Sequence, residues 1–254
     1  MHKPKLPGVM GLKTFKGHSF HSSRWDYNYA RGDSRSNLHK LSDKRVGIIG
    51  TGATAVQIVP RLGEWAKDLY VFQRTPSSID VRNNRPTDPQ WVKSLGENWQ
   101  QKRMDNFNAI ISGGHQEEDL VSDGWTDVYA KYAVQPIEAG KDSLVEVEEK
   151  RQLADFENME QIRARVDSIV KNSSTAEKLK PFYHQFCKRP CFHDEYPHTF
   201  NRPNVTLIDT NGQGVKAITE NGVVACGKDY ELDCLIYATG FELTTDFARE
   251  VGTT

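Results

Sequence analysis

The chain has 254 residues, of which 37% are hydrophobic, with a formal net charge of −1 and a mean hydropathy of −0.65. These values give no electrostatic basis for binding nucleic acid or a membrane surface, and no apolar run approaches the roughly 20 residues that span a bilayer. Four cysteines in a chain of this length do not form a disulfide framework, and the first residues lack the apolar core of a signal peptide. We therefore expect a cytoplasmic protein.

The first part of the chain predicts a connection followed by a βαβ unit. Residues 1–43 are rich in Gly, Pro, Ser, Lys and His with little periodicity, which indicates an extended connection. Residues 45–50 (RVGIIG) predict a short apolar strand, residues 53–66 a helix, and residues 68–74 (DLYVFQR) a second strand. Strand, glycine loop, helix and strand in this order are typical of the start of a dinucleotide-binding fold.

The second part predicts helices and then short strands. Charged and amide side chains dominate residues 86–181, and residues 152–180 predict one or two amphipathic helices. Their apolar side is expected to contain Phe156, Met159, Ile162, Val166, Ile169 and Val170. Short strands are expected at 204–209, 215–219, 223–226 and 232–237. The predicted fold is α/β: a Rossmann-like domain of residues 44–85 and 182–240, with a helical insertion over 86–181 and a β-rich return segment.

The glycine loop, residues 50–55, carries the strongest sign of function. Gly50 permits the tight turn, Gly52 lets backbone N–H groups approach a pyrophosphate, and Ala55 keeps helix and strand close. The start of the helix adds about half a positive charge. The expected cofactor contacts here are Gly50, Thr51, Gly52, Ala53, Thr54, Ala55 and Gln57. A purely structural glycine turn is the alternative, and the flanking strands argue against it.

The end of the second predicted strand indicates which dinucleotide binds. NAD-binding proteins place an Asp or Glu there for the ribose 2′-hydroxyl. This chain has Arg74 and Thr75, and a guanidinium and a hydroxyl can both donate to a 2′-phosphate. We therefore predict NADPH rather than NADH. The alternative is that Arg74 only ends a strand at the surface.

Residues 15–26 contain the pattern F-x-G-x-x-x-H-x-x-x-W-D, formed by Phe15, Gly17, His21, Trp25 and Asp26. At this spacing from the glycine loop, the pattern resembles the fingerprint of Baeyer–Villiger monooxygenases. The resemblance implies an enzyme that uses NADPH, FAD and O2 to insert oxygen beside a ketone carbonyl. It also implies that His21 lies in the connection between the FAD and NADPH domains and ties domain movement to catalysis.

Two further motifs support this resemblance. The segment 187–205 looks like the corresponding stretch of the family, which implies that Lys188 helps to hold the 2′-phosphate. It also implies that Arg189 is the active-site arginine that stabilises negatively charged intermediates. Ala238, Thr239 and Gly240 match the short motif that links the NADPH domain back to the FAD domain. Taken alone, Lys188 and Arg189 would be interpreted as a solvated basic pair.

A metal site is the other possibility for this segment, because His184, Cys187, Cys191 and His193 are zinc-type ligands. Their spacing lacks the paired geometry of familiar zinc sites, so no metal is expected.

The resemblance also implies a truncated form. Only fourteen residues precede Phe15, where a complete enzyme has a FAD loop, so FAD binding by this chain is doubtful. Residues 1–43 would be the fingerprint-bearing connection, and residues 241–254 the start of the return to a missing FAD domain. We expect an NADPH- and FAD-dependent monooxygenase with a small-molecule ketone substrate, and a partner chain that supplies a FAD domain is compatible with this. The alternatives are a catalytically silent NADPH-binding remnant or sensor, and an interaction protein that uses the helical insertion.

Overall fold

The structure is a computed structural model that describes residues 3–33, 37–132 and 144–242. The chain divides into two compact units. We call the first the sheet unit (residues 1–77, 165–181 and 195–254) and the second the helical unit (residues 78–164 and 182–194). Within the described ranges, no helix has both the length and the apolar character needed to cross a membrane.

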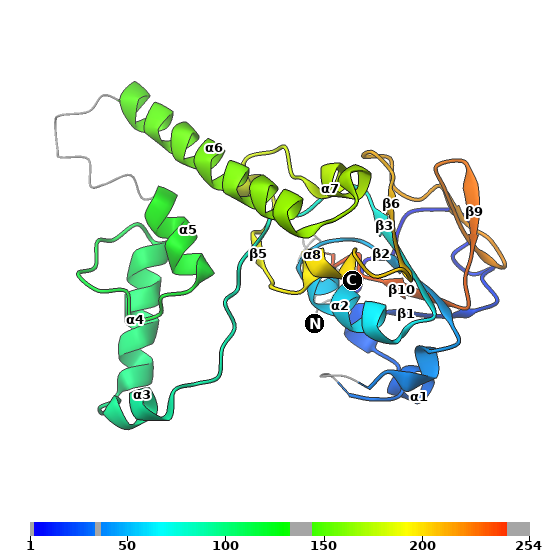
Figure 1. The fold of residues 1–254 in the computed structure, drawn as a ribbon, viewed down its shortest axis with the longest axis horizontal. Helices are drawn as coiled ribbons and strands as arrows, with labels where there is room; N and C mark the ends of the chain where they lie inside the picture. The colour runs from blue at the N-terminus through cyan, green and yellow to red at the C-terminus, as the bar shows by residue number, and fades with distance from the viewer. Residues whose placement is uncertain (1–2, 34–36, 133–143, 243–254) are drawn as a thin grey trace, which may run out of the picture. The chain divides into compact units, whose positions relative to one another are not determined.

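The sheet unit contains a five-stranded sheet with the strand order β1-β10-β2-β3-β6 (Figure 1). Its strands are β1 His18–His21, β2 Arg45–Ile49, β3 Asp68–Gln73, β6 Val205–Asp209 and β10 Cys234–Tyr237. All neighbouring pairs are parallel, so the carboxyl ends of the strands meet at one edge. β3 and β6 lie on one side of β2, whereas β10 and β1 lie on the other. This order places a topological switch point between β2 and β10, where open α/β sheets bind their ligands.

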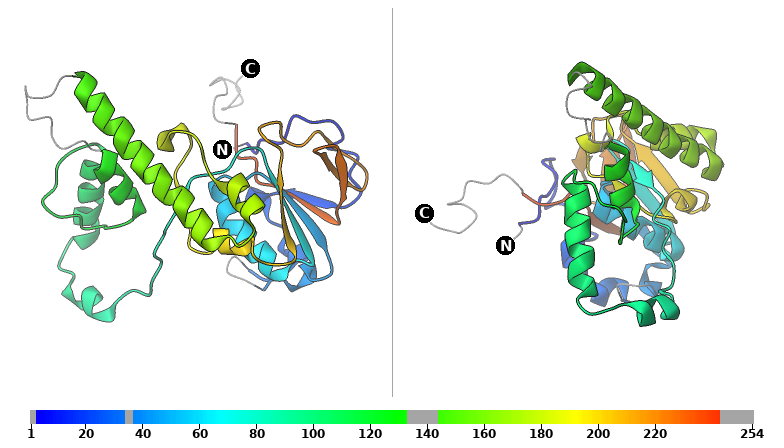
Figure 2. Two further views of the ribbon diagram at one scale, coloured as in Figure 1. Left: turned by 45° about the horizontal axis from the view of Figure 1, so that its top comes forward. Right: turned by 90° about the vertical axis from the view of Figure 1, so that its left-hand side faces the viewer.

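Different elements cover the two faces of this sheet. Helix α2 Ala53–Trp65 follows β2 and contacts β2, β3 and the short helix α8 Tyr196–Thr199. The other face packs against a three-stranded antiparallel sheet (orange in Figure 2), made of β7 Ala217–Ile218, β8 Gly222–Ala225 and β9 Lys228–Glu231. The unit also contains α1 Tyr27–Ala30 and α7 Ser173–Leu179, and 3-10 turns at Ser22–Arg24 and His39–Leu41.

The alternation of side chains along each strand assigns them to these two layers. Ile49, Phe72 and Leu235 belong to the cluster that packs against β7 and β8. Their buried neighbours Ile48 and Val71 point to the opposite face, because successive residues of a strand alternate. Strands buried on both faces read as continuous apolar runs, which is why β2, β3 and β10 are rich in Val, Ile and Leu.

The helical unit contains α3 Pro89–Ser94, α4 Trp99–Ile111, α5 Gly124–Tyr132 and most of α6 Leu144–Ile169 (Figure 1). A short parallel pair, β4 Ile79–Asp80 with β5 Cys191–Phe192, joins its two chain segments. The 3-10 turn Gln185–Cys187 lies between α7 and β5. The last residues of α6, from 165 onward, belong to the sheet unit.

The α/β fold class and its parallel sheet are confirmed. The helix after the glycine loop and the strands on either side of it lie within one residue of their predicted bounds. The strand β9 was not predicted, and the strands predicted at 215–219 and 232–237 are shorter than expected.

The compact units divide the chain differently from the predicted domains. Residues 1–43 are not only an extended connection, because they supply strand β1 and helix α1 to the sheet unit. Residues 78–85 and 182–194 group with the helical unit through the β4–β5 pair, whereas 165–181 group with the sheet unit. The return predicted over 241–254 lies outside the described residues from 243 onward.

The predicted apolar side of α6 is corrected at one end. Met159, Ile162, Val166 and Val170 are buried as expected, and Ile169 is half-buried. Phe156 is 56% exposed, and the polar Asp155 and Asn158 take the buried positions of that turn. Hydrogen bonds to Asp155 and Asn158 explain why polar side chains are tolerated there.

Candidate functional site

The glycine loop lies at the carboxyl end of β2, beside the end of β10. Gly50 has φ +111°, and a Cβ at this position would lie 2.6 Å from the Ala238 carbonyl oxygen. Only glycine combines this backbone conformation with this close approach. A Cβ on Gly52 would meet nothing within 4 Å, so the space above the loop is open. Gly52 caps α2 without a side-chain hydrogen bond, which leaves the first N–H groups of the helix available.

The loop is attached to the segment that follows β3. The Thr51 hydroxyl donates to the Thr75 carbonyl oxygen over 2.9 Å, and the Ser77 hydroxyl donates to the Thr51 carbonyl oxygen over 2.6 Å. Thr51 is 6% exposed. Sequence reasoning missed Ser77, although a hydroxyl residue next to the turn-forming Thr-Pro pair is a usable signal. These bonds fix the loop in place before any ligand binds.

The remaining residues predicted in the loop occupy different environments. Ala55 is fully buried against the sheet, as expected for close packing of helix and strand. Ala53 is half-buried and Thr54 is exposed. The exposed side chain of Gln57 donates to the Ala53 carbonyl oxygen of its own helix over 3.1 Å.

Ala238, Thr239 and Gly240 lie next to the glycine loop. The Ala238 N–H donates to the Ile49 carbonyl oxygen over 2.9 Å, which continues the β10–β2 pairing up to the loop. The Thr239 hydroxyl donates to the Lys5 carbonyl oxygen. Gly240 has φ +80°, and its carbonyl oxygen accepts from the Lys5 N–H over 2.9 Å. The structure thus brings the two glycine motifs together at the switch point of the sheet.

His21, at the end of β1, contacts the second of these motifs. Its Nε2 lies 3.0 Å from the Gly240 carbonyl oxygen, and its Nδ1 lies 3.2 Å from the Ser23 backbone nitrogen. Because a carbonyl only accepts, Nε2 carries the proton and Nδ1 accepts from Ser23. Burial lowers the pKa of His21, against the raising effect of the Gly240 hydrogen bond. The ring is therefore a neutral hydrogen-bonding link between β1 and the end of β10.

The other fingerprint residues lie around β1 and the start of β10. A Cβ on Gly17 would lie 2.5 Å from the Phe15 ring and 2.8 Å from the Asp233 carbonyl oxygen, so this close packing excludes a side chain. Trp25 packs edge-on against Phe20 with ring centroids 5.1 Å apart.

Asp26 caps helix α1. Its carboxylate accepts from the Asn28 and Tyr29 backbone N–H groups and lies 3.0 Å from His18 Nε2. These hydrogen bonds hold the pKa of Asp26 below its usual range, with the Tyr29 bond as the main cause. In this unit the fingerprint residues therefore make packing and capping contacts.

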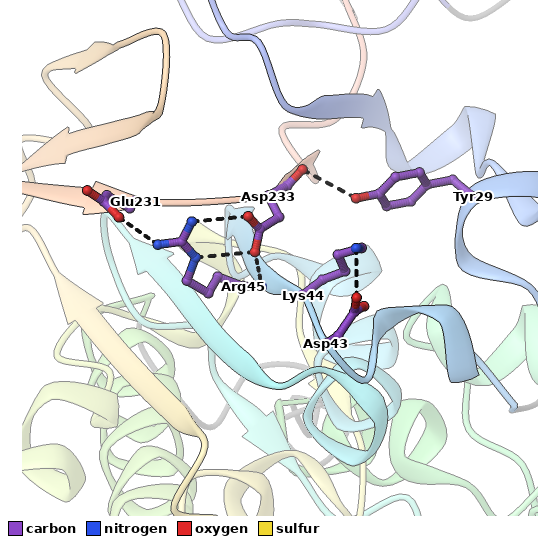
Figure 3. Close-up of polar contacts among 6 residues, drawn as sticks. All are labelled: Tyr29, Asp43, Lys44, Arg45, Glu231 and Asp233. Carbon is purple, nitrogen blue, oxygen red and sulfur yellow. Dashed lines mark hydrogen bonds and ion pairs between the residues drawn. The ribbon is translucent and has the colours of Figure 1, made fainter.

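An ion-pair network fixes the amino ends of the same strands. Arg45 at the start of β2 binds the carboxylate of Asp233 through Nε at 3.2 Å and NH2 at 3.0 Å, and Glu231 at 2.7 Å (Figure 3). The Arg45 hydrogen bond holds the pKa of Asp233 below its usual range. The Tyr29 hydroxyl donates to the Asp233 carbonyl oxygen over 3.3 Å. A hollow of about 400 Å³ beside Arg45 and Asp233 lies at these amino ends, away from the glycine loop.

Arg74 and Thr75 follow β3 at the same edge of the sheet as the glycine loop. The side chain of Arg74 is exposed, and no ion pair joins it to a residue in the described parts of the chain. Thr75 is half-buried, and its carbonyl oxygen accepts from Thr51. The neighbouring Gln73 is fully buried and donates to the Lys178 carbonyl oxygen over 2.7 Å. Arg74 is therefore the residue of this segment that faces solvent with a free charge.

Lys188 and Arg189 belong to the helical unit, whereas the glycine loop belongs to the sheet unit. The Lys188 ammonium lies 4.9 Å from the centre of the Tyr183 ring, and the exposed Arg189 guanidinium lies 5.9 Å from that of Trp125. The region considered for a metal instead contains a carboxylate–imidazole contact, 2.7 Å between Asp155 Oδ2 and His184 Nδ1. Among the described residues, no three His, Cys, Asp or Glu side chains form a metal-binding group.

No family model matches the chain. A Baeyer–Villiger monooxygenase of Stachybotrys chlorohalonatus is 62% identical over 251 residues, which cover 98% of this chain and 40% of the relative. The pentalenolactone D synthase of Streptomyces exfoliatus is 57% identical over 245 residues, which cover 95% of this chain and 42% of that enzyme.

Solved structures agree with these relatives. A polycyclic ketone monooxygenase from Thermothelomyces thermophila has a TM-score of 0.83 at 44% identity, covering 94% of this chain and 39% of that one. OTEMO, crystallised with FAD and NADP, has a TM-score of 0.70 at 30% identity, covering 94% of this chain and 45% of its own. The chain spans about two fifths of the length of the curated relatives that it matches. By sequence and by fold, the chain is similar to about two fifths of these Baeyer–Villiger and ketone monooxygenases.

Proposed function

We propose that the chain is the NADPH-binding part of a Baeyer–Villiger-type monooxygenase, which oxidises a small-molecule ketone to an ester or lactone. The observation that carries this proposal is the meeting of the Gly50 loop with Ala238–Gly240 at the switch point of the sheet. That arrangement occurs in a chain that is 62% identical to a Baeyer–Villiger monooxygenase. The free cysteines, Cys187, Cys191, Cys226 and Cys234, fit a reducing cytoplasm as the location.

The residues present fit an NADPH molecule. The open space above Gly52 and the uncapped N–H groups of α2 suit a pyrophosphate. The exposed guanidinium of Arg74 suits the 2′-phosphate, with Thr75 beside it. Lys188 is a second cation proposed for this phosphate, on the strength of the family resemblance. NADPH supplies a hydride when it is bound, and these residues bind and orient it.

FAD is proposed as the second cofactor of the whole enzyme, because OTEMO was crystallised with both FAD and NADP. The described residues contain one strand–glycine loop–helix unit, which begins with β2. We therefore assign the FAD-binding loop to the part of the relatives that this chain does not span. Arg189 is the proposed catalytic residue, since a permanently charged fork stabilises negative charge that develops during oxygen insertion.

The first experiment is calorimetric titration of the purified chain with NADPH and with NADH. We expect NADPH to bind more tightly, and Arg74→Ala to lower NADPH affinity by about tenfold, the effect of one lost charge-assisted contact. Arg85→Ala is the matched control, because Arg85 is also exposed but lies in the helical unit. Equal NADPH affinity for the Arg74→Ala variant and the wild type would reject the cofactor assignment.

The second experiment is the absorption spectrum of the chain after incubation with FAD and gel filtration. We expect no flavin to remain bound, in agreement with a FAD-binding loop that lies elsewhere in the relatives. Retained flavin would reject that assignment. No observation favours a silent remnant or an interaction protein over the monooxygenase family.

A further inference from the structure

The turn that follows β6, residues 210–214, is bound to the backbone on both sides of Arg74. Thr210 donates to the Gln73 carbonyl oxygen twice, from its N–H over 2.9 Å and from its hydroxyl over 2.8 Å. The Gly212 N–H donates to the Arg74 carbonyl oxygen over 2.8 Å. All of these residues belong to the sheet unit, and Thr210 is 3% exposed.

These hydrogen bonds fix the direction in which the Arg74 side chain leaves the backbone. The Gln73 and Arg74 carbonyls belong to the two peptide planes that meet at the Arg74 Cα atom, and each plane is rigid. With both planes held, the two backbone dihedrals of Arg74 are set, and with them the direction of its Cα–Cβ bond. The Thr210 hydroxyl also accepts from the Gly214 N–H over 2.8 Å, so one buried oxygen organises the whole turn.

The same turn leaves room beside the Arg74 side chain. Gly214 has φ +77°, and a Cβ there would lie 3.9 Å from Arg74 Cδ. A longer side chain at this position would press on the stem of Arg74. The glycine therefore leaves the stem free to extend, while the backbone beneath it is fixed.

We propose that Thr210 is a positioning residue that determines the preference for NADPH over NADH. It acts through Arg74, by holding the peptide planes from which the guanidinium is presented to the 2′-phosphate. Thr210 itself is buried and touches only backbone atoms in the contacts described. The proposal rests on the proposed NADPH site and adds a specificity determinant to it.

The test compares dissociation constants for NADPH and NADH in the full 254-residue chain. Thr210→Val keeps the shape of the side chain and removes the hydroxyl. We expect it to weaken NADPH binding by about tenfold, as for one lost buried hydrogen bond, and to leave NADH binding within about twofold. Thr210→Ser, which restores the hydroxyl, is expected to recover NADPH binding.

Thr206→Val is the matched control, because Thr206 lies on β6, the strand just before Thr210, with an exposed side chain. Equal losses for NADPH and NADH in Thr210→Val would indicate a general structural role and overturn the proposal. Unchanged NADPH binding would also overturn it. If the valine variant does not fold, Thr210→Ala removes the hydroxyl without adding a methyl group and gives the same comparison.

The Arg74→Ala variant separates this proposal from the cofactor assignment. If Arg74→Ala leaves NADPH binding unchanged, the assignment itself fails and the role of Thr210 fails with it. If Arg74→Ala weakens NADPH binding and Thr210→Val does not, only the positioning role fails. If Thr210 acts through Arg74, adding Thr210→Val to Arg74→Ala causes no further loss of NADPH affinity.

Discussion

The interior of the sheet unit is mainly apolar, whereas the helical unit buries polar and apolar side chains to a similar extent. The buried apolar residues described in the helical unit are Ile79, Val128, Val147, Met159, Ile162 and Cys191. Its buried polar residues are Ser78, Asn106, Thr126, Asp155, Asn158 and Gln185. In the sheet unit the strands β2 and β10 contribute the fully buried Val46, Ile48, Leu235 and Ile236.

Asp155 shows how the helical unit accommodates its polar residues. The carboxylate, 5% exposed, accepts from the Gln185 N–H over 2.8 Å, from His184 Nδ1 over 2.7 Å and from the Tyr132 hydroxyl. Burial, together with the hydrogen bond to Asp155, raises the pKa of Tyr132 well above its usual range. One carboxylate thus connects α5, α6 and the start of the 3-10 turn Gln185–Cys187.

The two interiors respond to different kinds of change. Removing apolar atoms from a packed sheet leaves a cavity, and the cost grows with its volume. Removing one partner from a hydrogen-bonded group leaves buried donors unsatisfied. The four variants below test this difference, and hydrogen exchange reports on each unit separately.

Leu235→Ala is expected to have the largest effect. Leu235 is fully buried between the two sheets, so its truncation should lower the free energy of unfolding by about 4 kcal/mol. Denaturant titration measures the loss, and amides of β2 and β10 should exchange faster. Leu153→Ala, at a position 58% exposed, is the matched control with little expected change. Equal acceleration of exchange in α4 and α5 would show that the two units do not unfold independently.

Asp155→Asn is expected to cost about 3 kcal/mol in the helical unit, as when one member of a buried charged group is removed. The amide has one acceptor oxygen in place of two, so a donor of His184, Gln185 or Tyr132 loses its partner. Faster exchange should appear in α5 and α6 and not in β2. Glu157→Gln makes the same change of charge at an exposed position of α6. If Asp155→Asn costs no more stability than the control, the hydrogen bonds to Asp155 do not stabilise the helical unit.

Gly50→Ala is expected to cost about 2 kcal/mol in the sheet unit, because alanine is strained at φ +111° and its Cβ meets the Ala238 carbonyl oxygen. Gly52→Ala is the matched change at a position with open space, and thermal unfolding should show almost no loss for it. Titration with NADPH should show the opposite order, with the larger loss of affinity for Gly52→Ala. The methyl group added at Gly52 would occupy the space proposed for the pyrophosphate. Normal NADPH binding by Gly52→Ala would argue against that placement.

The smallest expected effect is the contribution of His21 to the pH dependence of folding stability. Its folded-state pKa is lowered, so the unfolded chain, with an ordinary histidine pKa of about 6.5, takes up the proton first. The contribution of His21 is therefore complete above about pH 6.5 and is lost as the pH falls through the folded-state pKa. Urea titrations from pH 7.5 to 5 should show a smaller fall in stability for His21→Gln than for the wild type. His39→Gln, at an exposed position, is the matched substitution.

Features that depend on a local sequence pattern could be predicted from the sequence. Features that depend on contacts between residues far apart in the chain could not. The β2–α2–β3 unit was predicted because apolar runs and glycines mark it locally. Strand β1 was missed because its four residues, His18–His21, carry no apolar alternation and pair with a strand more than 200 residues away. Phe156 was placed inside because a hydrophobic pattern does not reveal that Asp155 finds three donors.

The candidate site shows the same division. The glycine loop and Arg74 could be identified from spacing along the chain. The contact of Gly50 with Ala238, and the support that Thr210 gives to the backbone of Arg74, join segments far apart in sequence. The order of residues along the chain indicates neither of these two contacts. The NADPH and NADH titrations of the Arg74 and Thr210 variants test the proposed roles.

The position of β10 between β1 and β2 also affects how the protein is made. The 185 residues that follow Ile49 up to Cys234 must be synthesised before β2 meets this neighbour, which takes on the order of 10–40 s at ribosomal speed. During that time the N–H and C=O groups along one side of β2 lack their final partners, on a strand of buried Val and Ile. Such an open strand edge promotes pairing with other chains. The yield of correctly folded protein should therefore depend on how well the nascent chain is protected until β10 emerges.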